Sequence, residues 1–137
     1  MAHAKFTVEI LTPEGEVFND EVEMVSTRTS LGEIGILANH EPVLATLEPT
    51  ELRLYRSETE IVRFAQAEGY LQVGGNHVML LVGEVTAPEA LDGAQLQERL
   101  QVAEREFEAA GDDSEKRRVA DRDRRRARAF LRIVQGD

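Results

Sequence analysis

Residues 31–43 read Leu31-Gly32-Glu33-Ile34-Gly35-Ile36-Leu37-Ala38-Asn39-His40-Glu41-Pro42-Val43. No simple period explains this stretch, in which two glycines, an acid and an Ile-Leu pair run into a polar corner. Glycines this close together are typical of close backbone approach or of positive φ. Pro42 pushes Glu41 toward an extended conformation, so we expect the chain to turn at residues 39–41 instead of continuing a strand.

Composition and charge limit the class of protein. The chain has 137 residues, of which 42% are hydrophobic and 31% charged, which is typical of a globular protein with one core-bearing domain and an appendage. It has no cysteine, which excludes a disulfide scaffold, a thiol nucleophile and a Cys-ligated metal site. No apolar run reaches the length of a membrane span, so we expect no direct membrane insertion.

The first 87 residues have the pattern of short strands. Phe6, Val8 and Ile10 alternate with polar residues, and similar alternation recurs at residues 52–55 and 62–64. Turn signals are frequent, and Gly74-Gly75-Asn76 separates two apolar runs in the manner of a hairpin. We predict an N-terminal antiparallel β-sandwich over residues 1–87.

After Pro88 the period becomes helical, and residues 88–137 are predicted to form a two-helix antiparallel hairpin. Asp92 is the expected N-cap of the first helix, and Ser114 that of the second. The first helix carries one apolar stripe, Leu96, Leu100, Ala103, Phe107 and Ala110. The second stripe is thinner and consists of Ala120, Ala127, Phe130, Leu131 and Val134. Because alanines bury little area, we expect the two helices to pair weakly.

The 31–43 stretch resembles the epsilon subunit of bacterial F-type ATP synthases, whose N-terminal domain carries a G-E-x-G-I-(aromatic or Leu)-P-x-H-x-P run. Six positions match this run: Gly32, Glu33, Gly35, Ile36, His40 and Pro42. Ala38 stands where the family usually has proline. The resemblance covers the whole chain, because a sandwich followed by a helical hairpin is also the family order.

The resemblance implies roles for Glu33 and His40, which match residues that face the polar loops of the membrane c-ring. The alternative is a solvated loop in which His40 only caps the turn. The same resemblance implies a tail that is either folded or extended along the rotor shaft into the catalytic alpha/beta hexamer, where it inhibits ATP hydrolysis.

The net charge of −10 is unevenly distributed, because the arginines concentrate after Thr86. Five of them form the predicted contact set of the tail: Arg122, Arg124, Arg125, Arg126 and Arg128. Asp121 and Asp123 interrupt this set and no aromatic residue interleaves with it, which argues against nucleic-acid binding. Two interpretations of this arginine set remain: a solvated face with internal ion pairs, and a surface that docks on an acidic protein. For the second interpretation, the resemblance implies that the acidic surface is a loop of the catalytic beta subunit.

Some epsilon subunits bind ATP through an [IL]-D-x-x-R-A motif at the start of the first helix, aided by arginines of the second helix. Leu91 and Asp92 match this motif, but Gln95 replaces the arginine and Leu96 the alanine. Arg126 matches one second-helix arginine, whereas Phe130 stands at the position of the other. Glutamine cannot replace the forked, charged donor of arginine, so we expect no nucleotide site and no cofactor.

Catalytic motifs are missing from the sequence. It has no G-x-x-x-x-G-K-[ST] loop, no G-x-S-x-G elbow and no H-E-x-x-H pair, and its three histidines are too scattered to indicate a metal site. We therefore expect a non-catalytic protein, and the resemblance implies a rotor subunit of a proton-translocating ATP synthase, peripheral to the cytoplasmic face of the bacterial plasma membrane. Its expected partners are the gamma subunit, the c-ring and the alpha and beta subunits. The alternative is a free-standing β-sandwich adaptor whose basic helical tail recruits an acidic protein.

Overall fold

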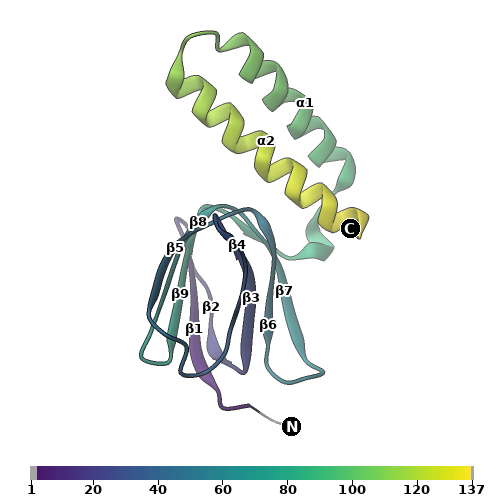
Figure 1. Cartoon of the computed structure of the whole chain (residues 1–137). Coiled ribbons are helices and arrows are strands. Elements are labelled where there is room, and N and C mark those ends of the chain that lie inside the picture. Colours follow the sequence, from purple (N-terminus) through teal and green to yellow (C-terminus); the bar gives the residue numbers. More distant parts are fainter. Residues whose placement is uncertain (1–2, 137) are drawn as a thin grey trace. The chain divides into compact units, whose positions relative to one another are not determined.

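Ten strands and two long helices make up the computed structural model, which describes residues 3–136 (Figure 1). The chain divides into two compact units, Met1–Ala87 and Pro88–Asp137. The strands are β1 (Phe6–Thr12), β2 (Gly15–Val22), β3 (Met24–Thr29), β4 (Gly32–Ile36), β5 (Val43–Leu47), β6 (Thr50–Tyr55), β7 (Ile61–Gln66), β8 (Gly69–Gly74), β9 (His77–Val82) and β10 (Val85–Thr86). The helices are the short 3₁₀ segment η1 (Pro88–Ala90), α1 (Gly93–Ala109) and α2 (Ser114–Gln135).

The strands of the first unit follow one hydrogen-bonded path, β10-β7-β6-β3-β5-β8-β9-β1-β2, with β4 paired to β3. A single registered pair, Thr29 opposite Leu47, joins β3 to β5. The predicted β-sandwich is confirmed, but it is not antiparallel throughout, because β1 runs parallel to β9. Short hairpin connections impose antiparallel pairing only on strands that are neighbours in sequence, and β1 and β9 are not.

The core of the first unit comes from the predicted alternation. Phe6, Val8 and Ile10 are buried on β1, as are Leu52 and Leu54 on β6. The predicted hairpin is also present, because β8 and β9 are joined by Gly75 and Asn76, both with φ of +58°. Two successive residues with positive φ are what a tight hairpin turn of this length requires.

The caps of the helices are partly as expected. The Asp92 carboxylate accepts hydrogen bonds from the backbone N–H of Ala94 (2.9 Å) and of Gln95 (3.3 Å), so the predicted N-cap of α1 is confirmed. The prediction for α2 is wrong by one residue, since its N-cap is Asp113, which accepts from Lys116 N at 3.1 Å, and Ser114 is the first helical residue. A carboxylate at this position satisfies the free N–H and also complements the positive end of the helix dipole.

The helical stripes bury three large side chains and otherwise alanines. On α1 only Leu96 and Ala103 are buried, while Leu100, Phe107 and Ala110 are half-buried. On α2 Ala120, Ala127, Phe130 and Leu131 are buried, and Val134 is exposed. Among the described residues, neither helix is apolar and long enough to cross a membrane.

Candidate functional site

The turn between β3 and β4 presents an apolar tip on a rigid support. The Thr29 hydroxyl accepts from Leu31 N at 3.2 Å and donates to the Gly32 carbonyl at 2.9 Å, and Ser30 N donates to the Thr46 carbonyl on β5 at 3.0 Å. Gly32 has φ of +122°, which an L side chain rarely adopts. The Leu31 side chain is 98% exposed, although the turn is held on both sides.

Glu33 follows this tip on β4. Its carboxylate lies 3.7 Å from the Arg28 guanidinium on β3, directly across the ladder, and its side chain is 80% exposed. An ion pair this exposed contributes little to stability. Breaking it so that Glu33 can contact a partner would therefore cost little free energy.

His40 lies in the corner that follows β4. Asn39 has φ of 65°, and its N–H donates to the Asn76 side-chain oxygen at 2.6 Å, while the Asn76 amide donates back to Asn39 Oδ1 at 3.2 Å. This reciprocal pair ties the corner to the β8–β9 turn. The His40 Nδ1 lies 2.7 Å from the Glu41 carbonyl oxygen, and because a carbonyl only accepts, this nitrogen is the donor.

Strand β4 separates the two predicted contact residues. Glu33 and Ile36 are three strand steps apart, or about 10 Å, and His40 lies beyond the end of the strand. Glu33 thus belongs to the β3–β4 tip and His40 to the Asn39–Asn76 corner. A partner that reaches both must extend along β4.

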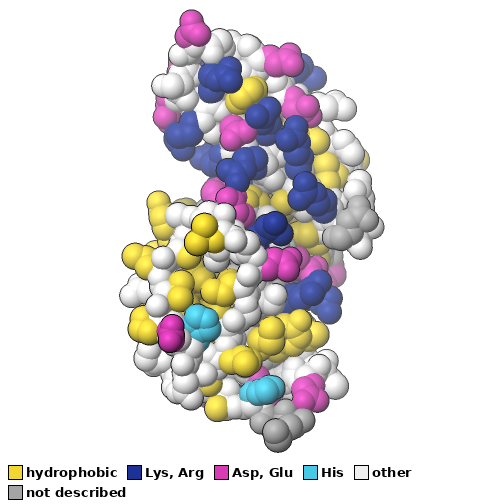
Figure 2. Space-filling view, viewed as in Figure 1, with side chains coloured by type: hydrophobic (Ala, Val, Ile, Leu, Met, Phe, Trp, Pro, Cys, Tyr) yellow, Lys and Arg dark blue, Asp and Glu magenta, His cyan; other side chains and the backbone are white. Residues whose placement is uncertain are grey.

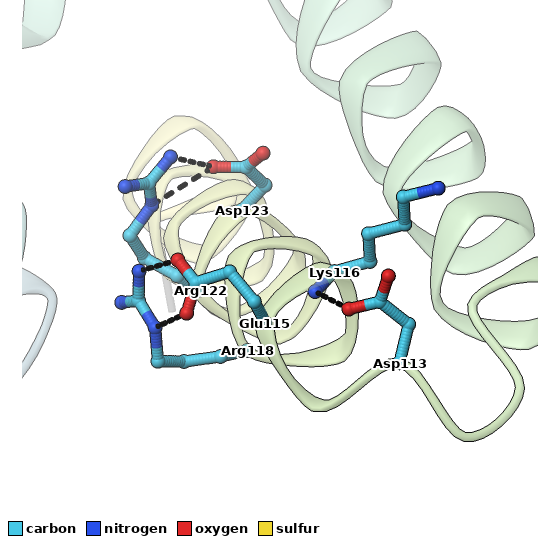
Figure 3. Close-up of polar contacts among 6 residues, drawn as sticks. All are labelled: Asp113, Glu115, Lys116, Arg118, Arg122 and Asp123. Carbon is cyan, nitrogen blue, oxygen red and sulfur yellow. Dashed lines mark hydrogen bonds and ion pairs between the residues drawn. The ribbon is translucent and has the colours of Figure 1, made fainter.

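The second candidate site is the set of arginines on α2. Arg118 grips Glu115 with two hydrogen bonds of 2.6 and 3.1 Å, and Arg122 grips Asp123 with bonds of 3.1 and 3.2 Å (Figure 3). The hydrogen bond and charge of Arg118 lower the pKa of the Glu115 carboxyl from its ordinary value, and Glu115 in turn raises the pKa of Arg118. Arg124 pairs with Asp121 at 2.8 Å. The internal ion pairs of the solvated-face interpretation are therefore present.

The helix spreads the predicted arginine set over several faces. At about 100° per residue, Arg124 and Arg128 lie on one flank of the stripe that carries Ala120 and Ala127, and Arg126 lies on the opposite flank, whereas Arg122 is almost as far from the stripe as a residue can be. Arg125 lies equally far from the stripe, on the other side. Figure 2 shows basic side chains over much of the helical unit, with acidic ones among them.

Two residues of the degenerate nucleotide motif have a structural role at the start of α1. Asp92 caps α1 with its carboxylate, and Leu96 is only 2% exposed. Leu91 is half-buried and Gln95 is exposed. No group of three or more acidic, histidine or cysteine side chains suited to a metal ion occurs among residues 3–136.

Sequence reasoning missed two features. The first is an apolar surface on neighbouring strands, where Leu44 on β5, Tyr70 on β8 and Leu81 on β9 are 79%, 60% and 44% exposed. Tyr70 stands directly opposite Leu81, and Thr46, two residues from Leu44, stands opposite Tyr70. Strand alternation does place Leu44 and Thr46 on one face, but only the pairing of β5 with β8 brings the three together.

The second missed feature is the environment of Phe107. The guanidinium carbons of Arg117 and Arg124 on α2 lie 4.3 and 3.7 Å from the centroid of its ring. The sequence places Phe107 in the apolar stripe, and the seven-residue spacing of the two arginines is the signal that could have indicated a shared stripe on α2.

Comparison with known proteins identifies the family. A family model described as the ATP synthase delta/epsilon chain β-sandwich domain matches residues 5–88. The ATP synthase epsilon chain of Priestia megaterium is 39% identical over 107 residues, which cover 77% of this chain and 78% of that one. The epsilon chain of Sulfurihydrogenibium sp. is 30% identical over 129 residues, covering 94% and 96%. The chain therefore belongs to the ATP synthase epsilon chain family, and the resemblance predicted from residues 31–43 is confirmed.

Solved structures agree on the fold. A chain of the Euglena gracilis mitochondrial ATP synthase, from the cryo-EM structure of its OSCP/F1/c-ring part, matches with a TM-score of 0.70 at 19% identity, covering 98% of this chain and 80% of that one. A chain of the Tetrahymena thermophila mitochondrial ATP synthase central stalk and c-ring matches with a TM-score of 0.62 at 19% identity, covering 98% and 99%. As an ATP synthase epsilon chain, the protein is a non-catalytic subunit, as the sequence predicts.

Proposed function

We propose that this chain is a central-stalk rotor subunit of a proton-translocating ATP synthase, at the cytoplasmic face of the bacterial plasma membrane. Its β unit joins the gamma shaft to the c-ring, and its helical unit inhibits ATP hydrolysis. The observation that carries the proposal is the division of an epsilon-family chain into a β unit with its own apolar core and a helical hairpin with few large buried side chains. Purification of a tagged chain from its host tests this, because a free-standing adaptor would come without the rotor subunits.

The apolar surface formed by Leu44, Tyr70 and Leu81 supports a contact with the gamma shaft. Three large apolar side chains exposed on adjacent strands are more than the scattered hydrophobic residues of an ordinary surface. An aromatic residue within such a patch is also typical of the centre of a protein interface. Figure 2 shows hydrophobic side chains gathered at the surface of the β unit.

The β3–β4 tip and the corner at His40 support a contact with the c-ring. Leu31 offers an apolar group and Glu33 a carboxylate on a turn that is already rigid, so little conformational entropy is lost on binding. The corner is equally fixed by the Asn39–Asn76 pair.

The c-ring contact is tested by crosslinking, because the chain has no natural cysteine. Glu33→Cys and His40→Cys should each crosslink to cysteines introduced in the polar loop of the c subunit. Arg63→Cys, an exposed position on β7, is the matched control and should not. Efficient crosslinking of both test positions to the catalytic hexamer would contradict the proposal. A crosslink from only one would limit the c-ring surface to that end of β4.

We also expect no ATP binding by the isolated chain at micromolar concentrations. A charged hydrogen bond contributes about 1.5–3 kcal/mol, so the loss of the motif arginine at Gln95 should weaken binding about ten- to a hundredfold. Calorimetric titration of the wild type should show no saturable signal. The double variant Gln95→Arg/Leu96→Ala is the informative companion, because it should gain binding if these two positions are the cause. Saturable micromolar binding by the wild type would overturn the prediction.

A further inference from the structure

The loop-proximal half of the helical hairpin is held by an aromatic ring between charged groups. Phe107 is the only aromatic residue of α1, and the guanidinium groups of Arg117 and Arg124 both lie within 4.3 Å of its ring centroid. The two arginines are seven residues apart on α2, which is two helical turns, so their side chains reach the ring from the same stripe.

Both guanidinium groups have a second contact that orients them. The Arg124 Nε donates to Asp121 Oδ1 at 2.8 Å, and the Arg117 Nη1 donates to the Gly111 carbonyl at 3.3 Å. Arg124 is thereby fixed against its own helix, while Arg117 also ties α2 to the loop that follows α1. These contacts keep the guanidinium groups over the ring, where the attraction between a cation and an aromatic face is strongest.

Phe107 is only half-buried, so burial of its ring contributes less than that of a fully buried phenylalanine. Between Arg117 and Arg124 on the same side of α2 lies Ala120, whose side chain is small. The two guanidinium contacts therefore add to a limited apolar contact between α1 and α2 here.

We propose that Phe107, Arg117 and Arg124 form a cation–π latch that keeps the hairpin closed. In the closed hairpin the face of the Arg124 guanidinium lies over the Phe107 ring and its Nε donates to Asp121, so only part of its hydrogen-bonding edge is left for an acidic partner. Separation of the helices frees both arginines for carboxylates of a partner. Folding of the hairpin and docking of α2 thus compete for the same charges. The competition with docking rests on the proposed inhibitory function, whereas the latch itself does not.

The latch is tested on the isolated full chain by measuring the distance between the helices. Spin labels are attached to cysteines at Gln97 and Arg132, exposed positions near the open end of the hairpin, each more than two helical turns from the nearest latch residue on its own helix. The wild type should show one short distance by pulsed electron spin resonance. Phe107→Ala should raise the population with a long distance about tenfold, which corresponds to the loss of two cation–π contacts of ordinary strength.

Matched variants separate the ring from its volume. Phe107→Leu keeps an apolar side chain but has no aromatic face, so it should open the hairpin nearly as much as Phe107→Ala. Arg124→Gln should also open it, whereas Arg122→Gln, whose guanidinium is paired with Asp123, should not. Far-ultraviolet circular dichroism checks that each variant keeps its helices. A closed hairpin in Phe107→Leu, or equal opening by Arg122→Gln and Arg124→Gln, would overturn the latch.

A second measurement addresses the competition. In the assembled ATP synthase, Phe107→Leu should lower ATP hydrolysis, because an open hairpin is available for docking more often. If the isolated chain opens as expected and hydrolysis is unchanged, the latch stands and the inhibitory function fails. If the isolated chain stays closed, the latch fails whatever the hydrolysis rate.

Discussion

Replacement of Gly69 by alanine should destabilise the β unit by about 3 kcal/mol or more, an effect at the upper end for overpacking. Gly69 begins β8 and stands opposite Val82 of β9. A Cβ at this position would lie 2.8 Å from the Val82 Cα and would overlap the backbone of Leu81, which cannot move aside as a flexible side chain could. For a unit of this size, the loss should lower the melting temperature by about 12 °C or more.

Gly74→Ala is the matched control, since it changes the other end of the same strand. A Cβ at Gly74 meets nothing within 4 Å, and the φ of this residue is not positive. Thermal unfolding followed by circular dichroism should therefore leave Gly74→Ala close to the wild type. Equal melting temperatures for Gly69→Ala and Gly74→Ala would show that β8 and β9 can separate at Gly69 without cost.

Gly69 also illustrates what the sequence can predict. A glycine near the start of β8 fits the bend at Glu68 between β7 and β8, but the reason that glycine is required at residue 69 lies in the backbone of a different strand. The same holds for the parallel pairing of β1 with β9, because alternation defines which face of a strand is buried and not which strand lies beside it. Local signals were sufficient where the structure itself is local, as with the Asp92 cap and the Gly75-Asn76 turn.

For the two candidate sites, the sequence likewise shows the residues involved but not how they are arranged in space. The glycine-rich motif indicates the family, but the distance between Glu33 and His40 follows from the length of β4, which the motif does not reveal. The arginines of α2 are evident in the sequence as a cluster. Which arginines contact the Phe107 ring and which pair with acidic side chains of α2 depends on how the two helices pack. The sequence does not predict these partners, because each long arginine side chain can reach several nearby carboxylates.

Removal of residues 88–137 should leave a folded β unit that still assembles, and should raise ATP hydrolysis by the complex. The sheet ends at Thr86, and the buried core residues of the β unit all lie before residue 88. If the tail holds the enzyme inhibited for about half to nine-tenths of the time, its removal should raise the rate about two- to tenfold. Steady-state hydrolysis by reconstituted complexes that carry the full or the shortened chain measures this.

Arginine variants should reproduce part of that release and identify the contact. Changing Arg122, Arg124, Arg125 and Arg126 to alanine removes charges that could meet an acidic surface, and the effect should be larger at low salt, where charges are least screened. Arg124 also holds Phe107, so its loss both weakens docking and opens the hairpin, and these changes act on hydrolysis in opposite directions. The triple variant that keeps Arg124 should therefore release hydrolysis more than the quadruple variant does.

The arginines can bias the tail between its two states but cannot lock it in one. Exposed ion pairs contribute about 0.2–1 kcal/mol each, so three of them contribute up to a few kcal/mol, which is less than the about 5.5 kcal/mol needed to hold the tail almost entirely in one state. Hydrolysis that is unchanged by the truncation and by both arginine variants would mean that the helical unit is structural and does not regulate the enzyme.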